Sequence, residues 1–348
     1  MRVVVSGGGG FLGSHLCEAL LRRGDSVCCL DNFSSGRAAN IAHLMREPGF
    51  DCVLCDVTER FRFSGQVDAV AHLASPASPF DYERHPLETL AAGSRGTENL
   101  LQLADRHGAR FVLASTSEVY GDPRVHPQDE EYWGHVNPVG PRSVYDEAKR
   151  FAEALATAYR RTREADVGIV RIFNTYGPRM RAHDGRVVST LIRQALDGEP
   201  LTLFGDGSQT RSFCYVDDMV RALVGMLDSR LPGPLNLGNP HERTVLELAE
   251  LVLLVTGSDS GLRFLPLPVD DPVRRQPVIT RAREKLGWHP RVPLEEGLRR
   301  TVDWFAAEKE AEREAEGPGP RPEGAGTQPA GHGKQPLGHD AQPVGRSS

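Results

Sequence analysis

The feature that most constrains the fold of this chain is a glycine cluster set between a β-branched strand and an amphipathic helix. The strand is Arg2–Ser6, glycine then recurs at every third position from Gly7 to Gly13, and the helical pattern runs from Phe11 to Arg23. Glycines allow a tight turn in which backbone N–H groups approach a pyrophosphate at a helix N-terminus. Glycine clusters also form ordinary turns, but this strand-and-helix context predicts a dinucleotide-binding unit. The residues predicted to hold the dinucleotide here are Gly7, Gly10, Phe11, Leu12 and Gly13.

Short apolar strands and amphipathic helices alternate through the first half of the chain. A long helix is expected at Val144–Arg163. Alternation of this kind predicts an α/β fold with a parallel, doubly wound sheet of the Rossmann type. After Arg2–Ser6, the strands expected in that sheet are Ser26–Asp31, Asp51–Val57, Val67–Leu73, Arg110–Ser115 and Val167–Phe173.

The rhythm changes after Asn174, where glycine and proline separate shorter pieces, and the chain is expected to return to the first lobe near Phe213–Asp228. We therefore predict two domains. The first, dinucleotide-binding domain comprises residues 1–173 with 213–238, and a smaller C-terminal domain comprises 174–212 with 239–307. Residues 308–348 become charged and then Gly/Pro/His/Gln-rich, which predicts a disordered tail because such a segment buries little apolar surface.

Composition excludes several classes of partner. The chain carries 41 basic and 47 acidic residues, a net charge of -6, which gives no basic stripe for nucleic acid. No apolar run approaches the roughly 20 residues that cross a bilayer, so no membrane partner is expected. The chain starts directly on strand Arg2–Ser6 without the pattern of a signal peptide, which predicts a cytoplasmic protein.

Six cysteines are scattered along the chain, and two of them have the spacing Cys52-x-x-Cys55. A metal site of this type needs a second pair, which is absent from the sequence. The pair lies in an apolar stretch, Phe50–Val57, that is typical of a buried strand. We therefore predict core cysteines and no metal site.

An acidic residue at the end of the second strand favours one dinucleotide over another. Asp31 closes that strand, where a carboxylate accepts hydrogen bonds from both ribose hydroxyls and repels a 2′-phosphate. This position predicts NAD rather than NADP. The ends of the next strands are expected to meet the adenine and the underside of the same ligand. The further residues predicted to bind NAD are Asn32, Gly36, Asp56, Val57, Leu73, Ala74 and Ser75.

A tyrosine and a lysine, Tyr145 and Lys149, are spaced to share one face of the long helix. Such a pair occurs often by chance, but Lys149 is one of only four lysines in the chain. A lysine ammonium and a positive nicotinamide ring stabilise a phenolate, and lowering the tyrosine pKa to about 7 requires roughly 4 kcal/mol. Tyr145 is then able to remove a hydroxyl proton while NAD accepts hydride from the same carbon. Thr116, at the end of the fifth strand, is placed to hydrogen-bond the same oxygen.

Together, the glycine cradle, Asp31, Thr116 and the Tyr145/Lys149 pair resemble the extended short-chain dehydrogenase/reductase family up to about Ala307. The resemblance implies an NAD-binding Rossmann domain with a smaller nucleotide-sugar-binding domain. Longer runs are similar to the family's UDP-glucuronate decarboxylase branch. These runs are residues 73–79, 114–123, 132–138, 171–180, 184–189 and 207–213.

The resemblance implies NAD-dependent conversion of UDP-glucuronate to UDP-xylose. Oxidation at C4 places a ketone β to the C6 carboxylate, carbon dioxide leaves, and return of the hydride gives a pentose with no net redox change. The implied catalytic residues are Thr116, Ser117, Glu118, Tyr145, Lys149 and Arg275. The implied substrate contacts are Glu118, Asn174, Arg211 and Arg275, with Arg275 on the substrate carboxylate.

Three further positions are less tightly assigned. Arg179 is able to serve either ligand and is placed with the cofactor residues. Tyr159 lies on nearly the same helical face as Tyr145, which predicts a substrate contact, with core or dimer packing as an equal alternative. An ionised Glu118 would repel a bound carboxylate, which leaves its protonation state open.

Two other function classes remain as alternatives. The first is a nucleotide-sugar 4,6-dehydratase or 4-epimerase. Dehydratases of the family carry an Asp-Glu pair where this chain has Ser117-Glu118, and epimerases usually lack the carboxylate at Glu118. The second is a non-catalytic dinucleotide-sensing protein, which the presence of both Tyr145 and Lys149 disfavours.

The chain departs from the branch at four positions. Gly93 and Ala148 stand where Asn and Gly are usual, and Gln276 and Val278 replace a common Lys and Asp. These changes concern the detail of the cofactor pocket and the reaction rate rather than the class of reaction. The branch also implies a homodimer formed through a helix bundle.

Overall fold

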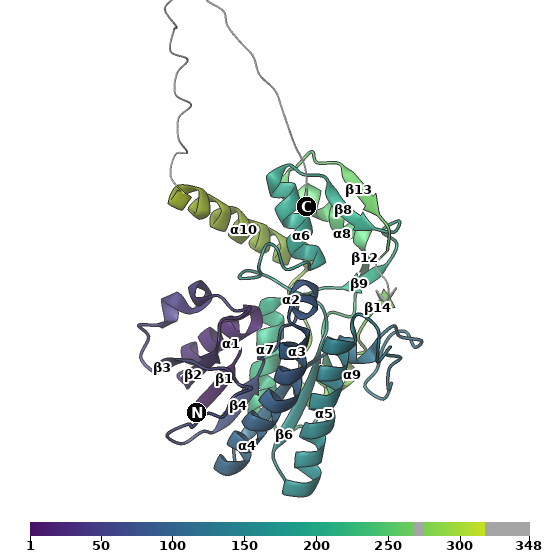
Figure 1. Cartoon of the computed structure of the whole chain (residues 1–348). Coiled ribbons are helices and arrows are strands. Elements are labelled where there is room, and N and C mark those ends of the chain that lie inside the picture. The colour runs from purple at the N-terminus through teal and green to yellow at the C-terminus, as the bar shows by residue number, and fades with distance from the viewer. Residues whose placement is uncertain (268–273, 317–348) are drawn as a thin grey trace, which may run out of the picture. The chain divides into compact units, whose positions relative to one another are not determined.

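The computed structural model describes residues 1–267 and 274–316, and Met1–Lys309 form one compact unit. Its main element is a seven-stranded sheet in the order β11-β6-β5-β4-β1-β2-β3, in which every neighbouring pair is parallel (Figure 1). This confirms the predicted parallel, doubly wound sheet. Its strands are β1 (Arg2–Ser6), β2 (Ser26–Asp31), β3 (Phe50–Leu54), β4 (Ala69–His72), β5 (Arg110–Thr116), β6 (Val167–Ile172) and β11 (Leu235–Leu237).

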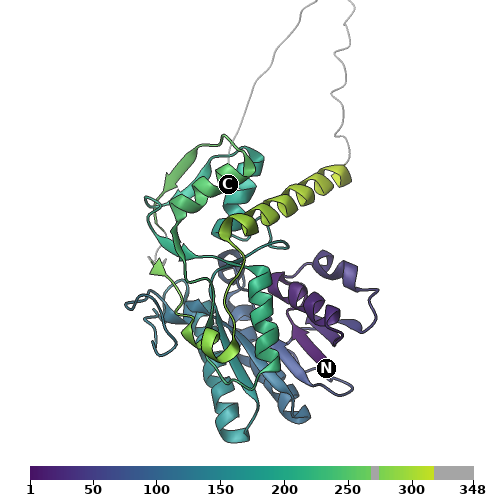
Figure 2. The same cartoon turned by 180° about the vertical axis from the view of Figure 1, so that it is seen from behind.

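Helices cover both faces of the sheet, as parallel sheets require. Because successive side chains of a strand point to opposite faces, Val3 and Val5 of β1 join one core and Val4 joins the other. The first core includes α1 (Phe11–Arg22) and α7 (Val216–Asp228), and the second includes α4 (Thr97–His107) and α5 (Ser143–Arg163). Figures 1 and 2 show these two helix layers from opposite sides.

Several short elements follow β4 and β5. They are α2 (Pro79–Arg84), α3 (Pro86–Ala91), the π-helix η2 (Ala92–Gly96) and the 3₁₀ turn η3 (Ser117–Tyr120), while another 3₁₀ segment, η1 (Ala38–Leu44), follows β2. After β6 the strands are short: β7 (Thr175–Tyr176) pairs with β10 (Cys214–Tyr215), β8 (Leu201–Phe204) with β13 (Leu262–Leu265), and β9 (Thr210–Ser212) with β12 (Glu242–Thr244) and β14 (Arg274–Arg275). The remaining helices are α6 (Val187–Asp197), α8 (Val245–Thr256), α9 (Thr280–Leu286) and α10 (Leu294–Glu316).

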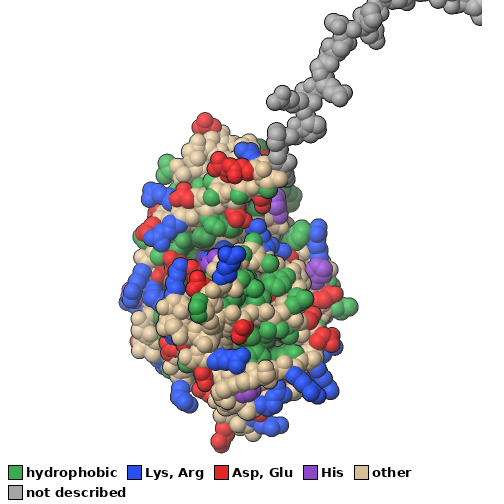
Figure 3. Space-filling model, turned by 90° about the vertical axis from the view of Figure 1, so that its left-hand side faces the viewer, with side chains coloured by type: hydrophobic (Ala, Val, Ile, Leu, Met, Phe, Trp, Pro, Cys, Tyr) green, Lys and Arg blue, Asp and Glu red, His purple; other side chains and the backbone are tan. Residues whose placement is uncertain are grey.

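Strand β3 differs from the expected buried strand. It ends at Leu54, and the side chains of Val53 and Leu54 are 44% and 76% exposed. The reason is its place at the edge of the sheet, where only β2 is beside it. Cys52 and Cys55 are free thiols and only half-buried. The prediction that they are core residues is therefore wrong, because their side chains are partly exposed. Figure 3 views the molecule from the side on which β3 lies in Figure 1 and shows hydrophobic side chains gathered there.

Helix α10 is longer than expected. The tail was predicted to begin at residue 308, but the helix continues to Glu316. Glutamate, lysine and alanine are strong helix formers, and this composition outweighs the lack of apolar residues. The rest of the predicted tail, residues 317–348, lies outside the described residues. Within residues 1–267 and 274–316, no helix combines the length and hydrophobicity of a bilayer-spanning segment.

Candidate active site

A cavity of about 1340 Å³ lies at the carboxyl ends of the central strands. The strand order reverses between β1 and β4, and open α/β sheets bind ligands at such a switch point. Nearly all residues predicted to bind cofactor or substrate line this cavity. They are Gly7, Gly10, Phe11, Leu12, Gly13, Asp31, Asn32, Gly36, Asp56, Val57, Leu73, Ala74, Ser75, Thr116, Ser117, Glu118, Tyr145, Lys149, Asn174, Arg179 and Arg211.

The turn after β1 has the dimensions of a dinucleotide cradle. Gly7 has φ +75°, and a Cβ there would lie 2.7 Å from the backbone nitrogen of Ala74. A Cβ on Gly13 would lie 2.0 Å from the carbonyl oxygen of Gly7. The N-cap of α1, Gly10, has no side chain to satisfy the first N–H groups of the helix. The turn therefore leaves backbone donors open to a pyrophosphate.

Asp31 lies where a ribose would meet the cradle. Its carboxylate accepts hydrogen bonds from the N–H groups of Gly9 and Phe33, both at 2.8 Å. Burial raises the pKa of Asp31, and these two hydrogen bonds oppose that rise. A carboxylate uses up to four lone-pair sites, so two remain for ribose hydroxyls. The residues present fit NAD.

Tyr145, in the first turn of α5, is fixed from three sides. Its ring stacks on Tyr82 of α2 with centroids 5.4 Å apart, and the Lys149 ammonium lies 5.8 Å from the ring centroid. Thr116 shares a hydrogen bond with the phenol. Burial raises the pKa of Tyr145 to about 12, and Glu118 adds to the rise while Thr116 opposes it.

Lys149 therefore does not lower the Tyr145 pKa by itself. Its Nζ donates to the Ala114 carbonyl at 2.9 Å, and burial lowers the pKa of the Lys149 ammonium to about 8. Moving the Tyr145 pKa from about 12 to neutrality needs about 7 kcal/mol, more than the sequence suggested. The positive charge that oxidised NAD would bring beside the phenol acts in the direction that lowers this pKa.

Glu118 is held between two arginines at the same end of the cavity. Its Oε2 accepts from Arg142 at 2.6 Å, and its Oε1 accepts from Arg275. Burial raises the pKa of Glu118, but the charges of Arg275 and Arg142 outweigh burial and lower it to about 2. The two guanidinium groups therefore favour the ionised form of Glu118, whose protonation state the sequence left open.

Arg275 does not line the cavity, contrary to its predicted place on the substrate carboxylate. Its side chain is 3% exposed, lies behind Glu118, and donates through Nη2 to the carbonyl of Gly121 at 3.0 Å. Arg142, which sequence reasoning missed, lines the cavity instead. A lone arginine before a predicted helix carries no distinctive sequence signal, and only the fold shows that it faces Glu118. Tyr82 was missed for the same reason.

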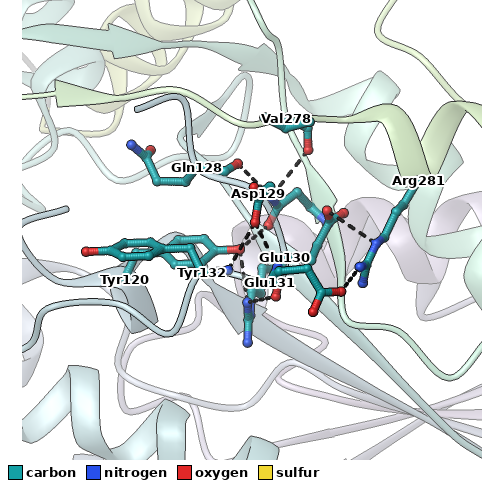
Figure 4. Close-up of polar contacts among 10 residues, drawn as sticks. Tyr120, Gln128, Asp129, Glu130, Glu131, Tyr132, Val278 and Arg281 are labelled. Atoms are coloured by element: carbon teal, nitrogen blue, oxygen red, sulfur yellow. Dashed lines mark hydrogen bonds and ion pairs between the residues drawn. The ribbon is translucent and has the colours of Figure 1, made fainter. Parts of the chain in front are cut away.

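Arg275 contacts Glu118 although 157 residues of sequence separate them, because hydrogen bonds join the segment after Arg275 to the loop after η3. The fully buried Gln128 accepts from the N–H of Gln276 at 2.9 Å and donates its own N–H to the Gln276 carbonyl at 2.9 Å. Val278 donates its N–H to the Gln128 carbonyl at 2.8 Å. These contacts use the backbones of residues 276 and 278, so the replacements there leave them intact. The surrounding network includes Tyr120, Asp129, Glu130, Glu131, Tyr132 and Arg281 (Figure 4).

Two other predicted residues take clear positions. Tyr159 does not line the cavity: it packs against the core between the sheet and α4/α5, which favours the core-packing alternative over a substrate contact. Fourteen residues of helix separate it from Tyr145, a rise of about 21 Å, although the two share a face. Arg179 pairs with Glu18 of α1, on the side of the dinucleotide cradle.

Gly93 and Ala148, two of the departures from the branch, contact each other. A Cβ on Gly93 would lie 2.6 Å from the Cβ of Ala148 and 2.7 Å from its carbonyl oxygen. The methyl group of Ala148 therefore occupies space that is free only because residue 93 is glycine. We therefore expect the two departures to compensate for each other in packing.

Gly93→Ala is expected to lower the free energy of unfolding by about 1–3 kcal/mol, because it overpacks this contact. Adding Ala148→Gly should recover part of the loss, since the methyl overlap is removed while the Ala148 carbonyl remains close. Urea unfolding of the two single variants and the double variant measures the coupling. Additive effects in this cycle would show that the two positions are independent.

Comparisons with known proteins agree with this geometry. The NAD dependent epimerase/dehydratase family matches residues 3–238. UDP-glucuronic acid decarboxylase 1 of Danio rerio is 52% identical over 309 residues, covering 89% of this chain and 73% of the relative. A protein of the same name from Arabidopsis thaliana is 52% identical over 305 residues, covering 88% of this chain and 70% of the relative.

Solved structures show the same fold with ligands. The UDP-glucuronic acid 4-epimerase of Bacillus cereus, in complex with UDP-glucuronic acid and NAD, has a TM-score of 0.79 at 28% identity and covers 88% of this chain and 100% of its own. The dTDP-glucose 4,6-dehydratase of Streptomyces venezuelae, with NAD bound, has a TM-score of 0.79 at 30% identity and covers 89% and 98%. The cradle, the tyrosine–lysine pair and these matches lead to one conclusion: this chain belongs to the NAD dependent epimerase/dehydratase family.

Proposed function

We propose that this protein is a UDP-glucuronate decarboxylase that forms UDP-xylose. One observation carries the proposal beyond the family: the ion cluster of Glu118, Arg142 and Arg275 lies at the same end of the cavity as the Tyr145 phenol. A base for a sugar hydroxyl thus stands next to guanidinium groups that recognise a carboxylate. Relatives about half identical to this chain carry the name UDP-glucuronic acid decarboxylase, which supports the same substrate.

The first step is oxidation at C4 of the sugar. NAD, when bound, accepts the hydride from C4 and later returns it. Tyr145 removes the proton of the C4 hydroxyl, and Thr116 hydrogen-bonds the same oxygen and keeps it in line with the phenol. Lys149 lies beside the Tyr145 ring, with its ammonium 5.8 Å from the ring centroid, and together with a positive nicotinamide it would stabilise the phenolate.

The second step is loss of the carboxylate, which is now β to a ketone. Arg142 faces the cavity and binds this carboxylate, while Arg275 holds Glu118 from behind. Arg275 therefore acts through Glu118 rather than on the substrate, which revises the role that the resemblance implied. The ionised Glu118 repels a second carboxylate beside it, and this repulsion disappears when neutral carbon dioxide leaves. Ser117, 1% exposed, completes the wall beside Glu118.

Asn174 and Arg211 are placed to bind the nucleotide portion. Both line the part of the cavity beyond β6, and Arg211 is 9% exposed. A guanidinium makes two parallel hydrogen bonds to a phosphate, which suits a diphosphate. We retain the division into a dinucleotide-binding domain (1–173 with 213–238) and a nucleotide-sugar domain (174–212 with 239–307) as part of this proposal.

Product analysis tests the function. The protein with NAD and UDP-glucuronate should release carbon dioxide and a UDP-pentose, and mass spectrometry of the nucleotide sugar measures both. UDP-glucose is the matched control, because it lacks the carboxylate and should return unchanged. A product with all its carbon atoms, such as the 4-epimer of UDP-glucuronate, would contradict the proposal and favour an epimerase.

The proposal includes a homodimer formed through α3 and α5, which pack side by side (Figure 1). Leu90 on α3 and Phe151 on α5 are large apolar side chains that are 38% and 51% exposed. Phe151→Glu should convert the dimer into a monomer, because a charge replaces buried apolar surface in the interface. Light scattering after gel filtration measures the mass. Leu254→Glu on α8 is the control, since Leu254 is 77% exposed elsewhere; equal masses for all three proteins would contradict this interface.

A further inference from the structure

Asp146 is a buried carboxyl group that the mechanism above does not use. It follows Tyr145 in the first turn of α5, and its side chain is 5% exposed. Within residues 1–267 and 274–316, its Oδ1 atom is buried and has no hydrogen-bond partner. A buried carboxylate without compensating hydrogen bonds is costly, so a group of this kind takes up a proton readily.

The charged and titratable groups around Asp146 come from four elements. Glu118 from η3, Arg142 next to α5, Glu147 on α5 and Arg275 from β14 all act on it. Tyr82 of α2 and Tyr145 also lie within its electrostatic reach. Burial raises the pKa of Asp146 to about 7, and Glu118 adds to the rise while the two arginines oppose it. Asp146 therefore titrates near neutrality inside the Glu118, Arg142 and Arg275 cluster.

Substrate binding adds a negative charge to this cluster. In the proposed complex the sugar carboxylate lies beside Arg142, about one helical turn from Asp146. An ionised Asp146 would then face a second buried negative charge besides Glu118, so the added carboxylate favours its protonated form.

We propose that Asp146 takes up one proton when the carboxylate of the nucleotide sugar binds beside Arg142, and that this uptake offsets the negative charge that the carboxylate adds to the buried cluster. The inference rests on the proposed decarboxylase function. Asp146 acts through Arg142 and Glu118 and is a positioning residue rather than a group that touches substrate.

The proton has a use in the balanced reaction. When the bond between C5 and the carboxyl carbon breaks, its electron pair moves into the enolate of the 4-ketone and neutral carbon dioxide leaves. C5 then needs one proton, so the overall reaction consumes one. The negative charge of the carboxylate passes to the enolate and is removed when C5 is protonated, so the Asp146 carboxyl is free to release its proton at the same stage of the cycle.

Calorimetric titration of UDP-glucuronate into the NAD-loaded Tyr145→Phe protein tests the proposal without turnover. At pH 8, with a pKa of about 7, Asp146 is mostly ionised before binding, so nearly one proton per site should be taken up. The uptake is read from the slope of the binding enthalpy against the ionisation enthalpy of several buffers. UDP-glucose, which lacks the carboxylate, should bind without uptake.

The variant Tyr145→Phe/Asp146→Asn should bind UDP-glucuronate without proton uptake. Its dissociation constant should be nearly constant from pH 8 to pH 9, whereas that of Tyr145→Phe should rise up to about tenfold. Glu147→Gln on the Tyr145→Phe background is the matched control, because the Glu147 carboxylate is 38% exposed and should leave the uptake intact. Thermal melting at pH 8 checks folding, and Asp146→Asn should melt no lower than its parent because it removes a buried carboxylate whose Oδ1 atom has no hydrogen bond.

The outcomes are separable. Binding of UDP-glucuronate without proton uptake, or uptake that persists in the Asp146→Asn variant, would overturn the role of Asp146 and leave the proposed function standing. Failure of UDP-glucuronate to bind the NAD-loaded protein would contradict the proposed function and this inference together. Uptake that disappears only with Asp146→Asn would support the proposal.

Discussion

Replacing Tyr145 with phenylalanine should lower the turnover of UDP-glucuronate by about a thousandfold or more, while NAD and UDP-glucuronate still bind. General-base groups contribute up to about four orders of magnitude to rate. Phenylalanine keeps the ring that stacks on Tyr82 and lies near Lys149, so the cavity wall stays in place. Single-turnover measurement of bound NADH formation reports the step directly.

Tyr159→Phe is the matched control for this experiment. It removes the same hydroxyl group from the same helix, but Tyr159 packs outside the cavity. Its turnover should be that of the unmodified protein. Near-normal hydride transfer in Tyr145→Phe would refute the base, and a comparable loss in Tyr159→Phe would show that the effect is one of helix packing.

Arg275→Ala should reduce both stability and carbon dioxide release. The arginine is 3% exposed and bonds Glu118 and the Gly121 carbonyl. Removing one partner of a buried ion pair typically costs about 3–5 kcal/mol of folding free energy. Without Arg275, Glu118 also loses its orientation, and we expect release of carbon dioxide to slow by about a hundredfold or more. Urea unfolding and a carbon dioxide assay measure the two effects.

Three further variants distinguish the loss of the ion pair from a general destabilisation of the fold. Arg274→Ala removes the exposed neighbour in the same strand and should change neither quantity. Arg275→Lys should not restore activity, because an ammonium does not reproduce the planar fork of a guanidinium. Arg275→Ala/Glu118→Gln should stay inactive, and it should lose less stability than the sum of the losses in Arg275→Ala and Glu118→Gln, because the two residues form one ion pair. Additive losses would show that the cost of Arg275→Ala does not come from the ion pair.

The parts of the site that follow from sequence are those formed by contiguous residues. The cradle from Gly7 to Gly13 is one turn whose geometry glycine alone permits, and Asp31 ends the next strand. Tyr145 and Lys149 meet because a helix places residues four apart on one face. Local periodicity fixes such contacts before any tertiary structure is known.

The parts that sequence did not predict depend on long-range packing. Arg275 meets Glu118 through backbone contacts of Gln128 with residues 276 and 278, which no local pattern encodes. The exposure of Val53 and Leu54 depends on which strand is at the sheet edge, and an apolar run looks the same at either place. The helical periodicity places Tyr159 on the same face of α5 as Tyr145, which suggested a substrate contact. Periodicity alone does not show how far along the helix axis a residue lies from the cavity.

The protonation state of Glu118 also depends on long-range packing and could not be predicted from the sequence. From sequence, a carboxylate near a substrate carboxylate has an undefined protonation state. Two guanidiniums, from a position before α5 and from β14, decide it, and they lower the Glu118 pKa to about 2. Burial raises the pKa of Asp146 instead, to about 7. Both guanidinium groups hydrogen-bond Glu118, whereas the Oδ1 atom of Asp146 is buried without a hydrogen bond.

The most direct test of the account uses UDP-glucuronate that carries deuterium at C4. Oxidation at C4 by bound NAD, loss of carbon dioxide and return of the same hydride predict a UDP-pentose that lacks the carboxyl carbon and still carries the deuterium. Mass spectrometry of the product reads both properties in one spectrum. A pentose without deuterium would contradict hydride return from the bound cofactor, and a labelled product that keeps its carboxyl group would contradict decarboxylation itself.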